Sequence, residues 1–401
     1  VAVMTSLSAH GSPTGFPPAR TDLVTEPSAA ALEALVEQLG DSSYAVRERA
    51  SQRLAAAGAT AADVLLAAAE QSDDLEVALR ARWLAESIPF TTGRESPEAT
   101  RLLENFASGD LAARVRIMHR LLRLDDDAGI EPLARIVRLE RTAAGSQIAA
   151  ALLVQDWEPA DPYWPKLAPA ILAGIGTSNR PAARFLRGLV AHATADSPAA
   201  SAHGIEACAA AAEPLTTGRN DMLALEPADQ LGEPTGVSRV GSVFRRCLVV
   251  LLTRAGRRAE ALAQAQLLLD PAFGPVAADR IPFELQWLTA RGLPEAVDLV
   301  TDRLTDESDP FLAYAAASAW LKRDGAEAEA KATSLAAVAS RRLGEEGVED
   351  RLTAAGILAR WGEIEWATRE YQTILDAPES RPAERALAAI FFAELLHDQE
   401  R

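Results

Sequence analysis

The sequence predicts an all-α fold, an α-solenoid in which helix–turn–helix units stack into a right-handed superhelix. Glycines at predicted turns recur about every 34 residues, at Gly256, Gly292, Gly325 and Gly362. Apolar residues on both sides of each glycine recur at helical spacing. Hydrophobic residues make up 48% of the 401 residues, so the chain can bury a large core. Its longest apolar runs are far shorter than the roughly 18 residues of a membrane-spanning helix.

The clearest unit runs from Arg351 to Pro378 and is predicted to form two helices joined by a tight turn at Gly362. Each half carries one apolar stripe. The stripes comprise Leu352, Ala355, Leu358 and Ala359 in the first helix, and Ile364, Ala367, Tyr371, Ile374 and Leu375 in the second. Because neither helix can bury its stripe alone, the unit needs copies of itself beside it.

Three further copies precede this unit, with their turns at Gly256, Gly292 and Gly325. The segment from Gly241 to Arg401 resembles the tetratricopeptide repeat family. The resemblance is carried by Glu260–Ala261 and Glu329–Ala330 in second helices and by Tyr314 in a first helix. It implies paired helices whose first members line a concave groove. The expected tryptophan is missing from most copies.

The last residues predict one more first helix, whose partner helix is absent from this sequence. The apolar residues that such a helix would leave uncovered are Phe391, Phe392, Leu395 and Leu396. An uncovered apolar stripe favours self-association through the C-terminal helix. The abrupt end at Arg401 indicates either a capping helix or a chain that continues further.

A second kind of repeat occupies residues 28–155, beginning with Ser28 as a helix N-cap. Three loose copies share an aspartate at a turn, then valine, arginine and small apolar residues in the following helix. The residues are Val46, Arg47, Ala50 and Leu54; Asp73, Asp74, Val77, Ala81 and Leu84; and Asp110, Val115 and Arg116. The pattern resembles HEAT-like repeats. Aspartate would cap the second helix, the apolar residues would pack on the first, and arginine would reach a neighbouring carboxylate.

Residues 1–27, which precede the first repeats, are predicted to be a disordered leader. Residues 156–240 are predicted to connect the HEAT-like repeats at 28–155 to the tetratricopeptide-like repeats at 241–401. Four prolines within 156–169 exclude a continuous helix and predict a hinge. The hinge aromatics either pack into the adjoining helices or, through Trp157 and Trp164, form an exposed anchor for a partner. Helices are expected to resume at 165–175, 181–193 and 199–213, followed by an irregular segment at 215–240.

The composition argues against several functions. A net charge of −17 disfavours nucleic-acid and anionic membrane surfaces as partners. We find no phosphate-binding loop, no metal-ligand spacing and no nucleophile–base pair. We therefore expect no catalysis, metal or cofactor. Cys208 and Cys247 are interpreted as two buried free thiols.

A row of cations near the predicted turns is the best candidate for a binding site. Arg254, Arg323 and Arg360, with Lys322, fall at the ends of first helices. One interpretation is a basic stripe that takes an acidic peptide or a C-terminal carboxylate by bidentate pairing. The other is simple compensation of the negative ends of helix dipoles.

These observations predict a non-catalytic scaffold that binds a protein or peptide along a solenoid surface. Two alternatives remain open: the interaction module of a larger enzyme or sensor, and a stand-alone enzyme on a helical scaffold. Scarce lysine and abundant alanine indicate a GC-rich bacterial genome. The N-terminus lacks the features of a signal peptide, which favours the cytoplasm unless that end has been processed.

Overall fold

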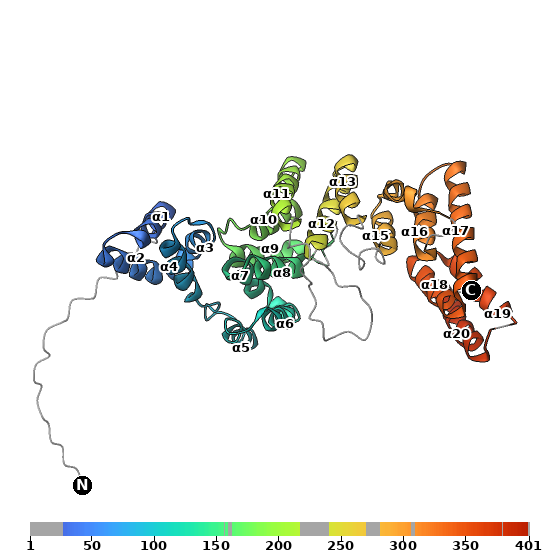
Figure 1. The fold of residues 1–401 in the computed structure, drawn as a ribbon, viewed down its shortest axis with the longest axis horizontal. Helices are drawn as coiled ribbons and strands as arrows, with labels where there is room; N and C mark the ends of the chain where they lie inside the picture. The colour runs from blue at the N-terminus through green and yellow to red at the C-terminus, as the bar shows by residue number, and fades with distance from the viewer. Residues whose placement is uncertain are drawn as a thin grey trace, which may run out of the picture. The chain divides into compact units, whose positions relative to one another are not determined.

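The computed structural model of the chain has an all-α helical repeat fold, with no β-strand among the residues it describes (Figure 1). The described residues are 27–155, 157–158, 163–216, 240–269, 281–305, 309–378 and 380–399. The predicted leader and most of the predicted irregular segment at 215–240 lie outside them. The chain divides into two compact units, Val1–Ile88 and Pro89–Arg401.

The first unit contains two helical hairpins separated by short 3-10 turns. Its elements are α1 (Ala29–Glu37), η1 (Gln38–Gly40), α2 (Tyr44–Ala57), η2 (Gly58–Ala61), α3 (Ala62–Gln71) and α4 (Leu75–Glu86). The hairpins pack α1 on α2 and α3 on α4, and α1 also contacts α3. Leucine and alanine side chains fill the interior, including Leu32, Leu54 and Leu65, as the helical periodicity predicts.

Two of the predicted caps of these hairpins are confirmed, whereas Asp41, the turn aspartate of the first copy, does not cap α2, which has no side-chain cap among the described residues. Ser28 accepts a hydrogen bond from the Ala31 amide at 3.3 Å. Asp74 accepts bonds from the amides of Glu76 and Val77 at 2.8 and 3.3 Å. Each cap satisfies amides that have no partner inside the first helical turn. The predicted reach of Arg47 is also present, because its Nε lies 3.0 Å from a carboxylate oxygen of Glu76.

The second unit holds the remaining helices. They are α5 (Pro97–Glu104), α6 (Leu111–Leu122), α7 (Ile130–Leu139), α8 (Ala143–Val154), α9 (Trp164–Ile175), α10 (Pro181–Ala193), α11 (Pro198–Thr216), α12 (Val240–Arg254), α13 (Arg258–Leu269), α15 (Ile281–Ala290), α16 (Pro310–Leu321), α17 (Ala326–Glu346), α18 (Val348–Trp361), α19 (Ile364–Asp376) and α20 (Pro382–Asp398). A 3-10 turn, η3 (Asp125–Asp127), precedes α7. Helices α9, α10 and α11 confirm the three helices expected after the hinge. The closest pairs include α10 with α11, α16 with α17 and α18 with α19.

The division between the two units falls inside the segment predicted to be HEAT-like. The first two copies of that pattern lie in the first unit, and the third, α5 with α6, lies in the second. Asp110 caps α6 by accepting a bond from the Ala113 amide at 2.7 Å. Neither repeat-family resemblance is tested by this geometry, and both stay predictions.

The four turn glycines adopt the backbone conformation expected of them. Their φ angles are +73° at Gly256, +82° at Gly292, +113° at Gly325 and +80° at Gly362. A Cβ added at any of the four would meet no atom within 4 Å. The backbone conformation alone therefore accounts for glycine at these turns.

The copy built around Gly292 departs from the predicted helical pair. In place of a second α-helix, the chain forms the 3-10 segments η6 (Pro294–Leu299) and η7 (Thr301–Arg303). The β-branched Val297, Val300 and Thr301 lose side-chain freedom in an α-helix, which weakens the helical preference here. Val297 and Val300 are nevertheless fully buried, so the segment still fills the second-helix position.

A buried polar cluster joins four of the C-terminal helices. The Tyr314 hydroxyl on α16 donates to Glu370 Oε1 on α19 at 2.6 Å. Arg351 on α18 donates to the other Glu370 oxygen, and its Nη2 lies 2.9 Å from the carbonyl of Ser340 on α17. Glu370 is 0% exposed. We call Tyr314, Arg351 and Glu370 the C-terminal triad.

The predicted apolar stripe on the last helix is only partly correct. Leu395 is buried and Phe392 packs against the core, so these two do not form an uncovered surface. Phe391 is exposed as predicted, at 41%, and the other exposed apolar side chains on α20 are Leu387 and Ile390, at 45% and 53%. Self-association through this helix therefore stays a prediction, with a partly different set of contact residues. In the described parts of the chain, no helix has the length and apolarity needed to cross a membrane.

Candidate functional site

The structure separates the four predicted cations into two groups. Arg254 ends α12 and Arg360 lies in the last turn of α18, both exposed. Lys322 is the C-cap of α16, and Arg323 follows it. Lys322 and Arg323 line a common hollow, and Arg254 and Arg360 do not line it. The hollow therefore contains two of the four predicted cations and not a continuous row of all four.

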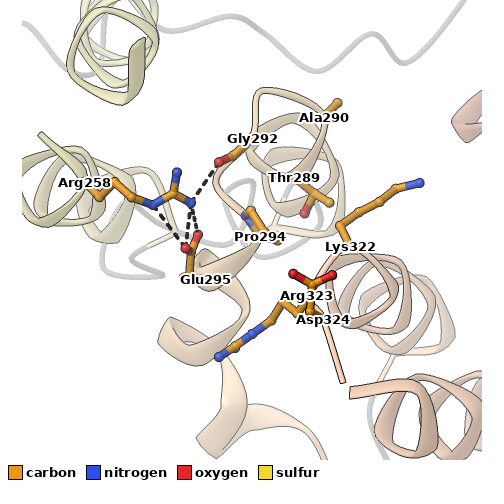
Figure 2. Close-up of a pocket in the computed structure, with 9 residues that line it drawn as sticks. All are labelled: Arg258, Thr289, Ala290, Gly292, Pro294, Glu295, Lys322, Arg323 and Asp324. Carbon is orange, nitrogen blue, oxygen red and sulfur yellow. Dashed lines mark hydrogen bonds and ion pairs between the residues drawn. The ribbon is translucent and has the colours of Figure 1, made fainter. Parts of the chain in front are cut away.

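The hollow lies where the turn after α15 meets the turn after α16, beside the start of α13 (Figure 2). Its volume is about 660 Å³. The residues that line it are Arg258, Thr289, Ala290, Gly292, Pro294, Glu295, Lys322, Arg323 and Asp324. We call it the turn hollow. Its position follows from the glycine turns, which bring the ends of stacked hairpins together.

Two of its three cations already have carboxylate partners. Arg258 Nη2 donates to Glu295 Oε1 at 2.6 Å and to the Gly292 carbonyl at 3.0 Å, as Figure 2 shows. Arg323 Nη1 donates to Asp298 Oδ1 at 2.7 Å. Although partial burial raises the pKa of Glu295, hydrogen bonding and charge from Arg258 outweigh it and lower that pKa.

Lys322 differs from its neighbours. Its side chain is exposed, and within the described residues it makes no ion pair. The guanidinium of Arg323 is held by Asp298 and by the Trp320 ring, whose centroid lies 4.2 Å away. Lys322 is thus the cation of the hollow that can meet an incoming anion without first leaving a partner.

Arg258 and Glu295 are site residues that the sequence reasoning missed. Each lies two or three residues after a turn glycine, Gly256 or Gly292, in successive copies of the repeat. Stacking of two hairpins brings equivalent positions side by side, so an arginine and a glutamate near equivalent turns are expected to meet. The repeat spacing in the sequence predicts this contact, although the partners lie 37 positions apart.

The aromatic anchor predicted at the hinge is wrong. Trp157 and Trp164 are each 5% exposed. Their rings meet edge to face with centroids 6.4 Å apart, and Trp157 also meets His192 at 6.2 Å. Burial of the imidazole lowers the pKa of His192, and the Arg254 cation lowers it further. The structure agrees with the alternative interpretation, in which the hinge aromatics pack into the adjoining helices.

The remaining reactive groups are held in unreactive settings. Cys208 and Cys247 are free and buried, as predicted. Burial raises the pKa of Cys247 to about 12 and that of Cys208 above its usual range, so both thiols stay protonated. The buried carboxylates Glu140 and Glu370 are paired with Arg114 and Arg351. No cluster of three or more possible metal ligands occurs in the part of the chain that the structure describes.

Comparison of the chain with protein-family models, with curated proteins and with solved structures found no match.

Proposed function

We propose that the chain is a non-catalytic interaction scaffold that binds an acidic segment or a free C-terminal carboxylate of a protein partner in the turn hollow. The observation that carries the proposal is the exposed Lys322, which has no ion-pair partner among the described residues and lies beside Arg258 and Arg323, each of which is paired with a carboxylate. A hollow of about 660 Å³ accommodates a few residues of an extended peptide.

The charges of the hollow support an anionic ligand. Arg258 and Arg323 are neutralised by Glu295 and Asp298, so among the described residues Lys322 is the lining cation without an ion-pair partner, in a chain whose net charge is −17. Anions are also disfavoured by the acidic remainder of the surface, so a local cation gives selectivity for this position. The carbonyl groups at the C-terminal ends of α15 and α16 do not contribute to anion binding, because they attract cations.

Selection from a random peptide library with free C-termini tests the proposal. We expect acidic peptides or peptides with a required C-terminal carboxylate to be enriched. Binding of a selected peptide, followed by fluorescence anisotropy, should weaken at high salt. The variant Lys322→Glu should weaken it by about tenfold or more, because a charge-assisted bond becomes a repulsion.

Arg360→Glu is the matched control. It also reverses a cation at the C-terminal end of a helix, so its effect on the helix dipole is the same. Because Arg360 does not line the turn hollow, the peptide affinity of this variant should equal that of the unmodified chain. Enrichment of no peptide, or equal loss of binding in both variants, would contradict the proposed site.

A further inference from the structure

A second cavity lies beside the buried hinge aromatics, between the end of α8, α12 and α15. Its volume is about 270 Å³. The residues that line it are Val154, Gln155, Trp157, Glu158, Val243, Arg246, Cys247, Val250, Trp287 and Arg291. We call it the hinge cavity. None of these residues lines the turn hollow, so the two features are independent.

Two guanidinium groups flank one indole ring in this cavity. Arg246 lies 5.6 Å and Arg291 lies 5.4 Å from the centroid of Trp287. Arg246 is held by Glu284 through its Nε at 3.0 Å, and Arg291 donates to Glu158 through one Nη group. Each guanidinium thus has a carboxylate counter-charge, Glu158 within the lining and Glu284 beside it, so a ligand is attracted by donor groups that remain unsatisfied and not by excess charge.

Two hydrogen-bond donors among the lining residues have no acceptor within the described parts of the chain. They are the indole Nε1 of Trp157 and the Nε of Arg291, both of which are buried. Trp157 is 95% buried, since its exposure is 5%. An unsatisfied buried donor is costly, and in folded proteins nearly all such groups have a hydrogen-bond partner. Since both orphans are donors, the missing partner is an acceptor.

The rest of the lining is apolar. Val154, Val243 and Val250 are buried, and the Trp287 ring adds an aromatic face. A dry apolar cavity of about 150 Å³ is large enough for benzene. At about 270 Å³ the hinge cavity has room for a ring of that size with a carboxylate attached.

We propose that the hinge cavity binds a small carboxylate with a compact apolar or aromatic body, its carboxylate at Arg291 and Trp157 and its body against Trp287 and the valines. Glu158 then acts as an internal competitor, because its carboxylate already occupies part of the Arg291 guanidinium. The same carboxylate chemistry is offered by a free acid and by the C-terminal residue of a peptide.

Calorimetric titration of the full chain tests the proposal, with benzoate as the probe and benzamide as its neutral isostere. We expect benzoate to bind and benzamide to bind about tenfold more weakly or worse, because hydrogen bonds to a charged group are the stronger ones. N-acetylphenylalanine stands in for a peptide terminus. If N-acetylphenylalanine binds more tightly than benzoate, the natural ligand is the C-terminal residue of a peptide. If benzoate binds more tightly, the natural ligand is a free acid.

Three variants assign the contacts. Arg291→Gln should weaken benzoate by about tenfold or more, and Trp157→Phe, which keeps the ring but removes the N–H, by about threefold to tenfold. Glu158→Gln should tighten binding, because the competitor is removed. A gain in affinity does not arise from damage to the fold, so this variant keeps the test decisive if the other two are unstable.

Arg257→Gln is the control, because Arg257 is a paired arginine that lies outside the cavity. Its benzoate affinity should match that of the unmodified chain. The proposal is overturned if neither probe binds, which would indicate a cavity filled by water. It is also overturned if benzoate and benzamide bind equally, or if Glu158→Gln leaves the affinity unchanged.

Discussion

Two hairpins of this chain, α3 with α4 and α18 with α19, form their turns by different means. In the first hairpin a side chain caps the start of the second helix, because Asp74 accepts bonds from the amides of Glu76 and Val77. In the second hairpin no side chain among the described residues caps α19, and the backbone instead closes the end of α18. The Glu363 amide donates to the Leu358 carbonyl at 2.9 Å across the left-handed Gly362. The first turn depends on a carboxylate, and the second depends on the absence of a side chain.

The interiors of the two hairpins differ as well. Apolar side chains such as Leu65, Val77 and Leu84 fill the first. The second contains the charged part of the C-terminal triad, which also draws on α16 and α17. Truncation of an apolar side chain leaves a cavity, whereas loss of one partner of a buried ion pair leaves the other charge uncompensated. We therefore expect the C-terminal hairpins to be sensitive even to a substitution that removes a charge and keeps the side-chain volume.

The largest effect is expected from Glu370→Gln. The substitution leaves the buried Arg351 without a counter-charge and should lower the free energy of unfolding of this region by about 3 to 5 kcal/mol. Hydrogen exchange of peptides from α18 and α19, read by mass spectrometry, measures the local loss.

Glu365→Gln on the same helix is its control, because Glu365 is exposed and should have little effect. Replacing both buried partners with apolar residues, as Arg351→Met with Glu370→Leu, should recover much of the stability. Equal exchange in Glu370→Gln and Glu365→Gln would show that the triad does not hold the region together.

The glycine turn offers the next contrast. Gly362→Ala places a Cβ at a φ of +80° and should destabilise the hairpin by about 1 to 2 kcal/mol. Gly356→Ala lies within α18, where the added Cβ would meet only Tyr371 Oη at 3.7 Å. It should stabilise the helix by about 0.5 to 1 kcal/mol. Opposite signs in denaturant unfolding would support this account, and equal signs would count against it.

The triad also predicts a dependence on alkaline pH. Burial raises the pKa of Tyr314 well above its usual value of 10.0, and the charge of Glu370 adds to this effect. Above pH 10 the unfolded chain releases this proton while the folded chain keeps it, so stability falls as pH rises. One pH unit above that value, the loss is about 1.4 kcal/mol.

Tyr314→Phe isolates this contribution. The variant should lose the phenol-dependent part of the alkaline slope, which comparison of unfolding curves at pH values either side of 10 would measure. An unchanged slope would mean that the Tyr314 proton is released equally in both states.

The smallest effect is expected at the side-chain cap of the first hairpin. Asp74→Ala should destabilise the start of α4 by about 1 kcal/mol, because two amides lose their acceptor. Asp73→Ala removes a neighbouring carboxylate that caps nothing and serves as the control. Exchange of the α4 amides should accelerate in the first variant alone. A similar acceleration in both would assign the effect to charge and not to capping.

Local features of the fold were predictable from the sequence. Ser28, Asp74 and Asp110 were identified as caps, and Gly362 as a left-handed turn, because each interaction joins residues only two to five positions apart. The stripes of α18 and α19 were predictable for the same reason. The failure at η6 has a local cause as well, since β-branched residues cluster in that segment.

The amino-acid sequence by itself thus determined the all-α class, several helix ends and most of the helical pairs around the turn glycines. Tertiary structure decided which charged groups are available. Arg323 is paired and Lys322 is not, although they adjoin in sequence. Trp157 is buried against Trp164 and His192. Glu370 meets Tyr314 across 56 residues. These outcomes depend on how successive hairpins stack. Stacking sets the distances between side chains from different helices, and it also sets how far each charged or polar group is removed from water.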